Sequence, residues 1–262
     1  MYSLPQEIHR EIISWLEPEE QQITRLTDRY FSQLIQPQDV NLLEFGAEHD
    51  LLEYCEIGLL RGNSKFNVCY IAAKNGHLEI LQWARGLLDF PTSERNENTV
   101  CPWDSRTCTW AACSGHLEVL QWAHSNGCPW DETTCAWAAW NGQFKVLQWA
   151  RYNGCPWDSK TCSQAASSGH LKVLRWARSQ GCPWDSKTCH AAAITGHLEV
   201  LQWAHSNGCP WDSKTCSAAA LAGHLEVLKY AIENGCPWDF RTTYVPSRHQ
   251  HIQEYIRVLR GR

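Results

Sequence analysis

Apolar and polar residues follow a helical period along much of this chain. Between Leu117 and Ala123 the apolar residues cover most sides of a helix. Polar residues from Glu118 to Ser125, spaced three and four apart, form a narrow stripe on the remaining side. Because a helix of this pattern buries every side except the stripe, we predict a helix that packs against neighbours on more than one face.

The residues after this helix predict how it ends. Gly127 can adopt the left-handed conformation just past a helix without a steric penalty. Cys128 stands where a Schellman-type ending places an apolar residue against the last turn, here against Ala123. Pro129 then prevents the helix from continuing.

A second helix is predicted to begin at Asp131. Its carboxylate can accept hydrogen bonds from the backbone N–H groups of Thr133 and Thr134, and its charge suits the positive end of a helix. Trp130 and Cys135 occupy the two positions of a hydrophobic staple around this cap. The complete unit is therefore helix–turn–helix–turn.

This unit repeats along the chain. A Cys-Pro-Trp-Asp tetrapeptide recurs every 27 residues, with its cysteines at Cys101, Cys128, Cys155, Cys182, Cys209 and Cys236. A glycine keeps the same spacing at Gly115, Gly142, Gly169, Gly196 and Gly223. Self-similarity at a fixed period of about 20 to 50 residues is typical of stacked repeats. We therefore predict an all-α helical-repeat solenoid, in which a small Ala-Ala pair lets neighbouring helices approach closely.

Residues 192–208 resemble an ankyrin repeat, because they read Ala-Ala-Ile-Thr-Gly-His-Leu-Glu-Val-Leu and close with Asn-Gly. The period is shorter than the family's ~33 residues, and Thr-Cys-His-Ala at 188–191 replaces the family's Thr-Pro-Leu-His. We therefore expect shortened loops between repeats and no projecting β-finger. Such short repeats with this tetrapeptide are similar to those of giant DNA viruses and some protists, for which a host protein would be the natural target.

Differences between the units indicate a candidate binding surface. Caps, staples and Ala-Ala pairs stay the same, whereas the first helix of each unit varies. In the ankyrin family the two residues after Ala-Ala lie on the concave face that contacts protein partners, and solenoids bind proteins through such elongated surfaces. The candidate partner-binding residues are Trp110, Trp137, Trp140, Gln164, His190, Ile194 and Leu221. Tryptophan is enriched in interface hot spots; the alternative is that some of these rings pack between units.

The first 38 residues do not repeat. Their Leu-Pro-Gln-Glu-Ile start, followed by apolar residues at helical spacing, resembles the F-box, a helical module that docks on the Skp adaptor of cullin-based ubiquitin ligases. The resemblance implies that the adaptor-binding residues are Leu4, Pro5, Ile8, Ile12 and Leu16. The alternative is a hydrophobic helical cap on the end of the solenoid, which such arrays need in any case.

Three segments of the solenoid, which spans residues 39–262, depart from the regular unit. Residues 39–62 resemble a degenerate first unit, and residues 87–100 contain an insertion that is polar and rich in helix breakers, which predicts a surface loop. Residues 239–262 are expected to form a polar closing cap, with Thr242 and His251 in step with Thr215 and His224.

Cysteine and histidine are abundant, and the repeat explains both. The chain has 14 cysteines. Equivalent cysteines of adjacent units should lie roughly 8–10 Å apart, whereas the Cα atoms of a disulfide lie within about 7 Å. We therefore interpret the cysteines as small buried apolar residues. The histidines of Gly-His-Leu are expected to cap or pack at the start of the second helix. We predict no metal and no other cofactor; the alternative is a metal-buffering protein.

Composition and charge narrow the function. A net charge of −5 argues against a nucleic-acid groove. No apolar run approaches a membrane span, no secretory signal is visible, and no catalytic motif appears. We expect a non-enzymatic monomer in the cytoplasm, or in the cytoplasm or nucleus of a host cell. Our main hypothesis is a receptor that brings a target protein to a Skp–cullin–F-box ubiquitin ligase. The alternative is a binding or scaffold protein whose N-terminal helices only cap the solenoid.

Overall fold

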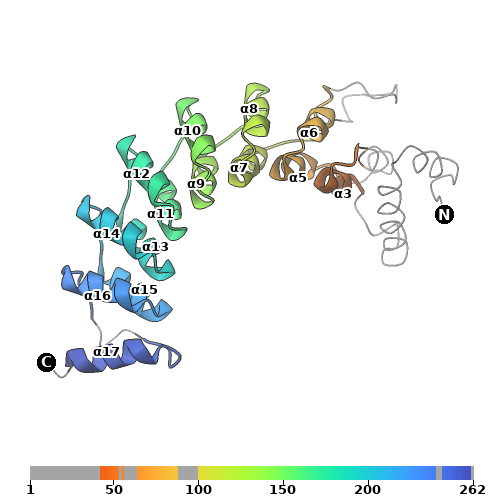
Figure 1. Ribbon diagram of the computed structural model, residues 1–262. Helices are drawn as coiled ribbons and strands as arrows, with labels where there is room; N and C mark the ends of the chain where they lie inside the picture. Colours follow the sequence, from red (N-terminus) through yellow and green to blue (C-terminus); the bar gives the residue numbers. More distant parts are fainter. Residues whose placement is uncertain (1–41, 53–54, 56–63, 88–99, 240–243, 261–262) are drawn as a thin grey trace, which may run out of the picture.

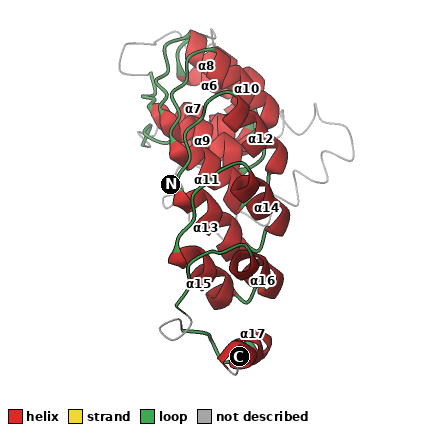
Figure 2. Cartoon of the chain, turned by 90° about the vertical axis from the view of Figure 1, so that its left-hand side faces the viewer, coloured by secondary structure: helices red, strands yellow, loops and turns green. Residues whose placement is uncertain are grey.

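The computed structural model describes residues 42–52, 55, 64–87, 100–239 and 244–260. All regular secondary structure in these ranges is α-helical (Figure 2). The helices are α3 (Leu42–His49), α5 (Val68–Asn75), α6 (Leu78–Ala84), α7 (Ser105–Ser114), α8 (Leu117–Ser125), α9 (Glu132–Trp140), α10 (Phe144–Tyr152), α11 (Ser159–Ser167), α12 (Leu171–Ser179), α13 (Ser186–Thr195), α14 (Leu198–Ser206), α15 (Ser213–Ala222), α16 (Leu225–Glu233) and α17 (Gln250–Arg260). The prediction of an all-α stack of paired helices is confirmed.

The helix pairs form a curved stack with two layers (Figure 1). The inner layer, on the inside of the curve, consists of α5, α7, α9, α11, α13 and α15, each packed against the next. The outer layer consists of α6, α8, α10, α12, α14 and α16, each packed against the inner helix of its own unit. The solvent-facing side of the inner layer is the concave face of the stack.

Small residues inside and branched residues outside make the core continuous from unit to unit. The Ala-Ala pairs of the inner helices, such as Ala165 and Ala166, are fully buried and let these helices pack closely. One leucine of each outer helix fills the space behind them; these are Leu81, Leu120, Leu147, Leu174, Leu201 and Leu228. Full burial of a leucine side chain contributes about 1.5–3 kcal/mol. Because each unit contributes side chains to the core that it shares with its neighbour, a single unit cannot bury its apolar face alone.

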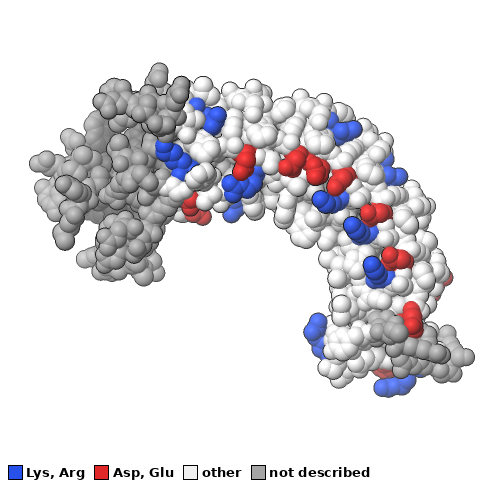
Figure 3. Space-filling view, turned by 180° about the vertical axis from the view of Figure 1, so that it is seen from behind, with Lys and Arg blue, Asp and Glu red and all other residues white. Residues whose placement is uncertain are grey.

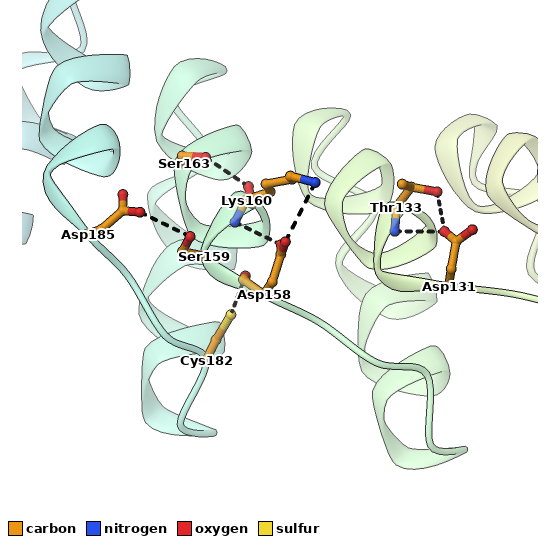
Figure 4. Close-up of polar contacts among 8 residues, drawn as sticks. All are labelled: Asp131, Thr133, Asp158, Ser159, Lys160, Ser163, Cys182 and Asp185. Carbon is orange, nitrogen blue, oxygen red and sulfur yellow. Dashed lines mark hydrogen bonds and ion pairs between the residues drawn. The ribbon is translucent and has the colours of Figure 1, made fainter.

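Aspartates of the tetrapeptide begin the inner helices (Figure 4). Asp131 Oδ1 accepts a hydrogen bond of 2.9 Å from the Thr133 backbone N–H and a second bond from the Thr133 hydroxyl. The prediction of a second carboxylate bond from Thr134 is wrong, because the Thr134 N–H donates to the main-chain carbonyl of Asp131 at 3.1 Å. Such a cap satisfies helix N–H groups that lack a partner inside the helix.

The outer helices end in the predicted Schellman turn. Gly127 has a φ of +81°, and its N–H donates to the carbonyl of His124 at 3.0 Å. The Cys128 N–H reaches back to the carbonyl of Ala123 at 3.0 Å. Cys128 is buried, so the apolar side chain folds onto the last turn as expected.

The tryptophan of each tetrapeptide joins successive outer helices. Trp130 is half-buried, stacks on His124 of α8 at 3.7 Å between ring centroids and meets the edge of Trp149 of α10 at 5.8 Å. In a later unit the guanidinium of Arg178 lies 4.1 Å from the Trp184 ring, where it replaces the histidine. Stacking of the tryptophan on a histidine or arginine of the preceding outer helix explains why the tryptophan recurs with every repeat. The staple between Trp130 and Cys135 stays a prediction.

The histidines of Gly-His-Leu pack against the preceding unit and do not cap their own helix. No side-chain capping bond is present at His116, His170, His197 or His224. The ring of His197 instead occupies the space where a Cβ on Gly169 would lie, at 2.7 Å from that Cβ position. The capping half of the prediction is therefore wrong, and the packing half needs one amendment: the neighbour of each histidine belongs to another unit.

The last helix closes the stack on the same principle. Ile252 and Ile256 of α17 are buried against the core, and the ring of His249 lies over Gly223. His251 was expected to stand in step with His224, but His249 takes that position and His251 Nε2 contacts the Gly223 carbonyl at 2.9 Å. The F-box-like residues 1–38, most of the 87–100 insertion and Thr242 lie outside the described residues.

Candidate protein-binding surface

The three candidate tryptophans meet on the inner layer. Trp110 of α7 stacks on Trp137 of α9, with ring centroids 6.2 Å apart and planes inclined by 24°. Trp140, one turn further along α9, meets Trp137 edge to face at 6.3 Å. Trp137 is 40% and Trp140 37% exposed, which is high for rings of this size. We call these three residues the tryptophan cluster.

Polar neighbours frame the cluster. The ammonium of Lys74 on α5 lies 5.3 Å from the centroid of the Trp110 ring, a cation–π contact. Asn141, which follows Trp140, donates to the carbonyl of Cys113 at 2.9 Å and so joins the ends of α7 and α9. An apolar, solvent-facing centre with a polar rim is the usual arrangement at a protein interface.

The other candidate residues lie further along the inner layer and do not join the cluster in one patch. Ile194 of α13 is 39% exposed, and Leu221 of α15 is 43% exposed. Gln164 of α11 is half-buried and stands between them and the tryptophans in the order of the stack. His190 is half-buried, with its Nδ1 3.3 Å from the Lys214 carbonyl. The inner layer therefore has two exposed apolar areas separated by a polar unit.

Acidic and basic side chains alternate along the stack at one end of the inner helices (Figure 3). Arg106 Nε pairs with Asp104 at 3.0 Å and Lys160 Nζ with Asp158 at 3.7 Å, so in these two units the aspartate has a basic partner in its own unit. Burial acts to raise the pKa of Asp131, but hydrogen bonds from Thr133 and other neighbours outweigh it and lower that pKa overall. The edge of the concave face therefore has no large area of a single sign.

None of the fourteen cysteines is in a disulfide and all are buried, which agrees with their interpretation as packing residues. Burial raises the pKa of the Cys69 thiol far above its ordinary value, so this thiol stays protonated and unreactive. The thiols also link units: Cys182 Sγ donates to the carbonyl of Asp158 in the preceding unit at 3.4 Å (Figure 4). The constant spacing of 24 residues between donor and acceptor was visible in the sequence, but its meaning depends on the stacking geometry.

The histidine and cysteine columns do not converge. Among the residues that the structure describes, no group of three or more His, Cys, Asp or Glu side chains could hold a metal ion. Both sets of side chains instead make contacts between units: the histidines pack over glycines, and cysteine thiols donate to backbone carbonyls. The tryptophan cluster also joins two units, through Trp110 and Trp137, but it leaves Trp137 and Trp140 exposed.

Comparisons with known proteins agree with this architecture. Residues 108–151 and 189–232 match the family model described as ankyrin repeats (many copies). Both matched segments are ankyrin repeats, and the chain folds as an ankyrin-repeat stack. Among solved structures, the crystal structure of the human ASB11 ankyrin repeat domain aligns with a TM-score of 0.52 at 14% identity, covering 71% of this chain and 96% of that one. No curated protein matches the chain.

The described part of the chain is thus built from helix pairs joined by loops. The described part has no strand, in agreement with the expected absence of a β-finger. It also has no helix that is long and apolar enough to cross a membrane. Ankyrin repeats are protein–protein interaction modules, so the surface that remains free for a partner is that of the helices themselves.

Proposed function

We propose that this ankyrin-repeat protein is a non-enzymatic receptor that holds a protein target on its concave face, centred on the tryptophan cluster. One observation carries the proposal: the stack does not need these rings. The positions of Trp137 and Trp140 are filled by Gln164 and Ser167 in α11, which packs in the same way between its neighbours. Two large rings left near 40% exposed, where a polar residue serves the fold, favour a binding role.

The residues of α11 also supply the test. In the variant Trp137→Gln with Trp140→Ser, the cluster carries the side chains of the neighbouring unit, so the fold should be kept. Tyr244→Ser serves as a control, because this ring is 73% exposed and lies at the far end of the stack. Each protein is immobilised and exposed to extract of the native cell, and retained proteins are identified by mass spectrometry.

We expect one retained protein to be lost from the cluster variant and kept by the control, with its affinity falling at least about tenfold, because hot-spot residues each contribute about 2 kcal/mol or more. Circular dichroism of both variants should match the parent. Retention of the same proteins by the cluster variant would refute the role of the concave face.

A further part of the proposal concerns residues 1–38. Their resemblance to the F-box supports a substrate receptor that recruits the Skp adaptor of a cullin ubiquitin ligase, with Leu4, Pro5, Ile8, Ile12 and Leu16 facing the adaptor. The similarity of the repeats to those of giant DNA viruses makes a host protein the expected target. Purified adaptor should bind the intact chain, and Leu4→Ala with Pro5→Ala should abolish binding. Absence of binding by the intact chain would favour the plain ankyrin-repeat scaffold, and would leave the test of the concave face unaffected.

A further inference from the structure

Two adjacent outer helices differ from all the others in charge. The fourth residue of each Gly-His-Leu-Glu run is Glu79, Glu118, Glu199 or Glu226 in four units, whereas this position is Lys145 in α10 and Lys172 in α12. A position filled by Gln121 or Gln202 elsewhere is occupied by Arg175 in α12. Neither α10 nor α12 contains an aspartate or glutamate. These two helices therefore carry a concentration of positive charge on the outer layer.

These three cations are exposed, and the fold does not require them. Lys145, Lys172 and Arg175 all face solvent, and within residues 100–239 none of them forms an ion pair with a carboxylate. Arg151 and Arg178 are different, because they lie over Trp157 and Trp184 at 4.6 and 4.1 Å and serve the contact between units. Arg175 also lies over a ring of the next unit, at 5.7 Å from the centroid of Trp203. Glutamine takes the position of Arg175 in other units and glutamate takes that of Lys172, so the stack does not depend on a cation at either position.

Aromatic side chains form an apolar floor beside the cations. Phe144 stands where other units have leucine, and its ring meets Trp176 edge to face at 5.7 Å. Tyr152, which is 70% exposed, also meets Trp176 edge to face, at 6.3 Å. Lys172 Nζ lies 4.6 Å from the centre of the Phe144 ring. A shallow depression of about 580 Å³ opens here, with Phe144 and Trp176 in its floor.

The rim of this depression is mostly positive. Lys172 and Arg175 stand on it, and Glu199 of α14 is the acidic residue among those that line it. Glu118 of α8 and Glu199 of α14 mark the limits of the positive area, so it is two outer helices wide. At roughly 10 Å between stacked helices, the area can be covered by an extended peptide of about six residues at ~3.3 Å each.

We propose that α10 and α12 form a second docking site, which binds a short acidic segment of a protein with one apolar side chain. Carboxylates of that segment pair with Lys145, Lys172 and Arg175, and the apolar side chain occupies the depression over Phe144 and Trp176. Arginine and lysine over aromatic rings suit carboxylate recognition, because the rings hold the cations in place while leaving their outer N–H groups free. This site lies on the opposite layer from the tryptophan cluster.

A peptide fits this surface better than a nucleic acid does. The whole chain has a net charge of −5 and a pI of about 6.2, whereas nucleic-acid-binding domains present a long basic stripe, with a pI above about 9. Acidic residues on α8 and α14 would repel a phosphate backbone that extends beyond two units. The short positive area and its apolar centre match a local acidic motif.

The test uses the full chain and a fluorescent peptide of about six glutamates with one central leucine, a length chosen to span the area. A neutral peptide has glutamine in place of glutamate, and a single-stranded oligonucleotide of similar charge serves as the competing probe. The site variant is Lys172→Glu with Arg175→Gln, which introduces the residues found at the same positions of α14. The control is Lys187→Glu with Lys214→Gln on the inner helices, which changes the net charge equally.

We expect the acidic peptide to bind the parent and the control within about twofold of each other, and the site variant to bind at least about tenfold more weakly, as anisotropy titrations measure. The neutral peptide should not bind. Equal weakening by site variant and control would reduce the effect to net charge and overturn the proposal. Failure of the parent to bind the acidic peptide would also overturn it, as would tighter binding of the oligonucleotide that the site variant abolishes.

Discussion

The contact between the histidine of one unit and the glycine of the unit before it can be measured with a pair of matched glycines. Gly196 and Gly208 both have φ at +82°. A Cβ on Gly196 would lie 2.6 Å from atoms of the His224 ring, whereas a Cβ on Gly208 would meet nothing within 4 Å. Alanine at either position should therefore cost the same free energy through the backbone conformation. Only alanine at position 196 should have an additional steric cost.

The magnitude follows from these two contributions. Alanine in the left-handed region costs about 1–2 kcal/mol, and both variants should lose this much unfolding free energy. Gly196→Ala should lose about 1–3 kcal/mol more, because the imidazole of His224 must leave its place or the two units must separate. A chain of roughly this size loses about 2–4 °C in melting temperature per kcal/mol. The melting temperatures of Gly196→Ala and Gly208→Ala should therefore differ by several degrees.

Urea unfolding followed by tryptophan fluorescence provides the free energies, and a double-mutant cycle provides the cause. In the presence of His224→Ala, the additional loss at Gly196→Ala should disappear, which corresponds to a coupling free energy of at least about 1 kcal/mol between residues 28 positions apart. Equal destabilisation by Gly196→Ala and Gly208→Ala, with no coupling to His224, would refute the proposed packing between units.

Three further predictions follow from the caps, the thiols and the core. Asp131→Ala should lower the unfolding free energy by about 0.5–2 kcal/mol at neutral pH. Because folding lowers the pKa of the Asp131 carboxyl, this loss relative to the parent should shrink as the pH falls below about 4. A loss that persists at lower pH would contradict the cap. A charged disulfide reagent should react slowly with all fourteen cysteines of the native chain and quickly after denaturation, so a single fast native thiol would show that burial is incomplete. Leu174→Ala, in the middle of the stack, should cost about 2–5 kcal/mol in a urea titration, while the exposed Leu221→Ala should cost less than about 0.5 kcal/mol; similar losses would place the core elsewhere.

The sequence predicts the contacts that a residue makes within its own unit. Asp131, Gly127 and Pro129 each act on backbone groups a few positions away, so their chemistry and spacing suffice to place the helix ends. Contacts between units are a different matter. A residue that recurs every 27 positions gives the same pattern whether its side chain contacts its own unit or an adjacent one. The sequence therefore did not show that His197 packs against the preceding unit. The bond from the Thr134 N–H likewise depended on how tightly the first turn closes.

The candidate surface was predictable to a similar extent. Differences between units, together with the family resemblance, identified the columns of Trp110, Trp137 and Trp140, and the structure brings these rings into contact. The exchange of glutamate for Lys145 and Lys172 was equally visible in the sequence. The role of this exchange could not be predicted, because only the stacked outer layer places Lys172 beside the depression that Phe144 and Trp176 line.

The seam between units has a consequence for how such a chain can grow. Each 27-residue segment offers an imidazole ring and a thiol to one side, and a glycine notch and a carbonyl oxygen to the other. A duplicated copy therefore arrives with both halves of the joint already complementary to its new surroundings. Gain or loss of copies by recombination changes the reach of the molecule and the order of its exposed side chains, without any need to redesign the joints.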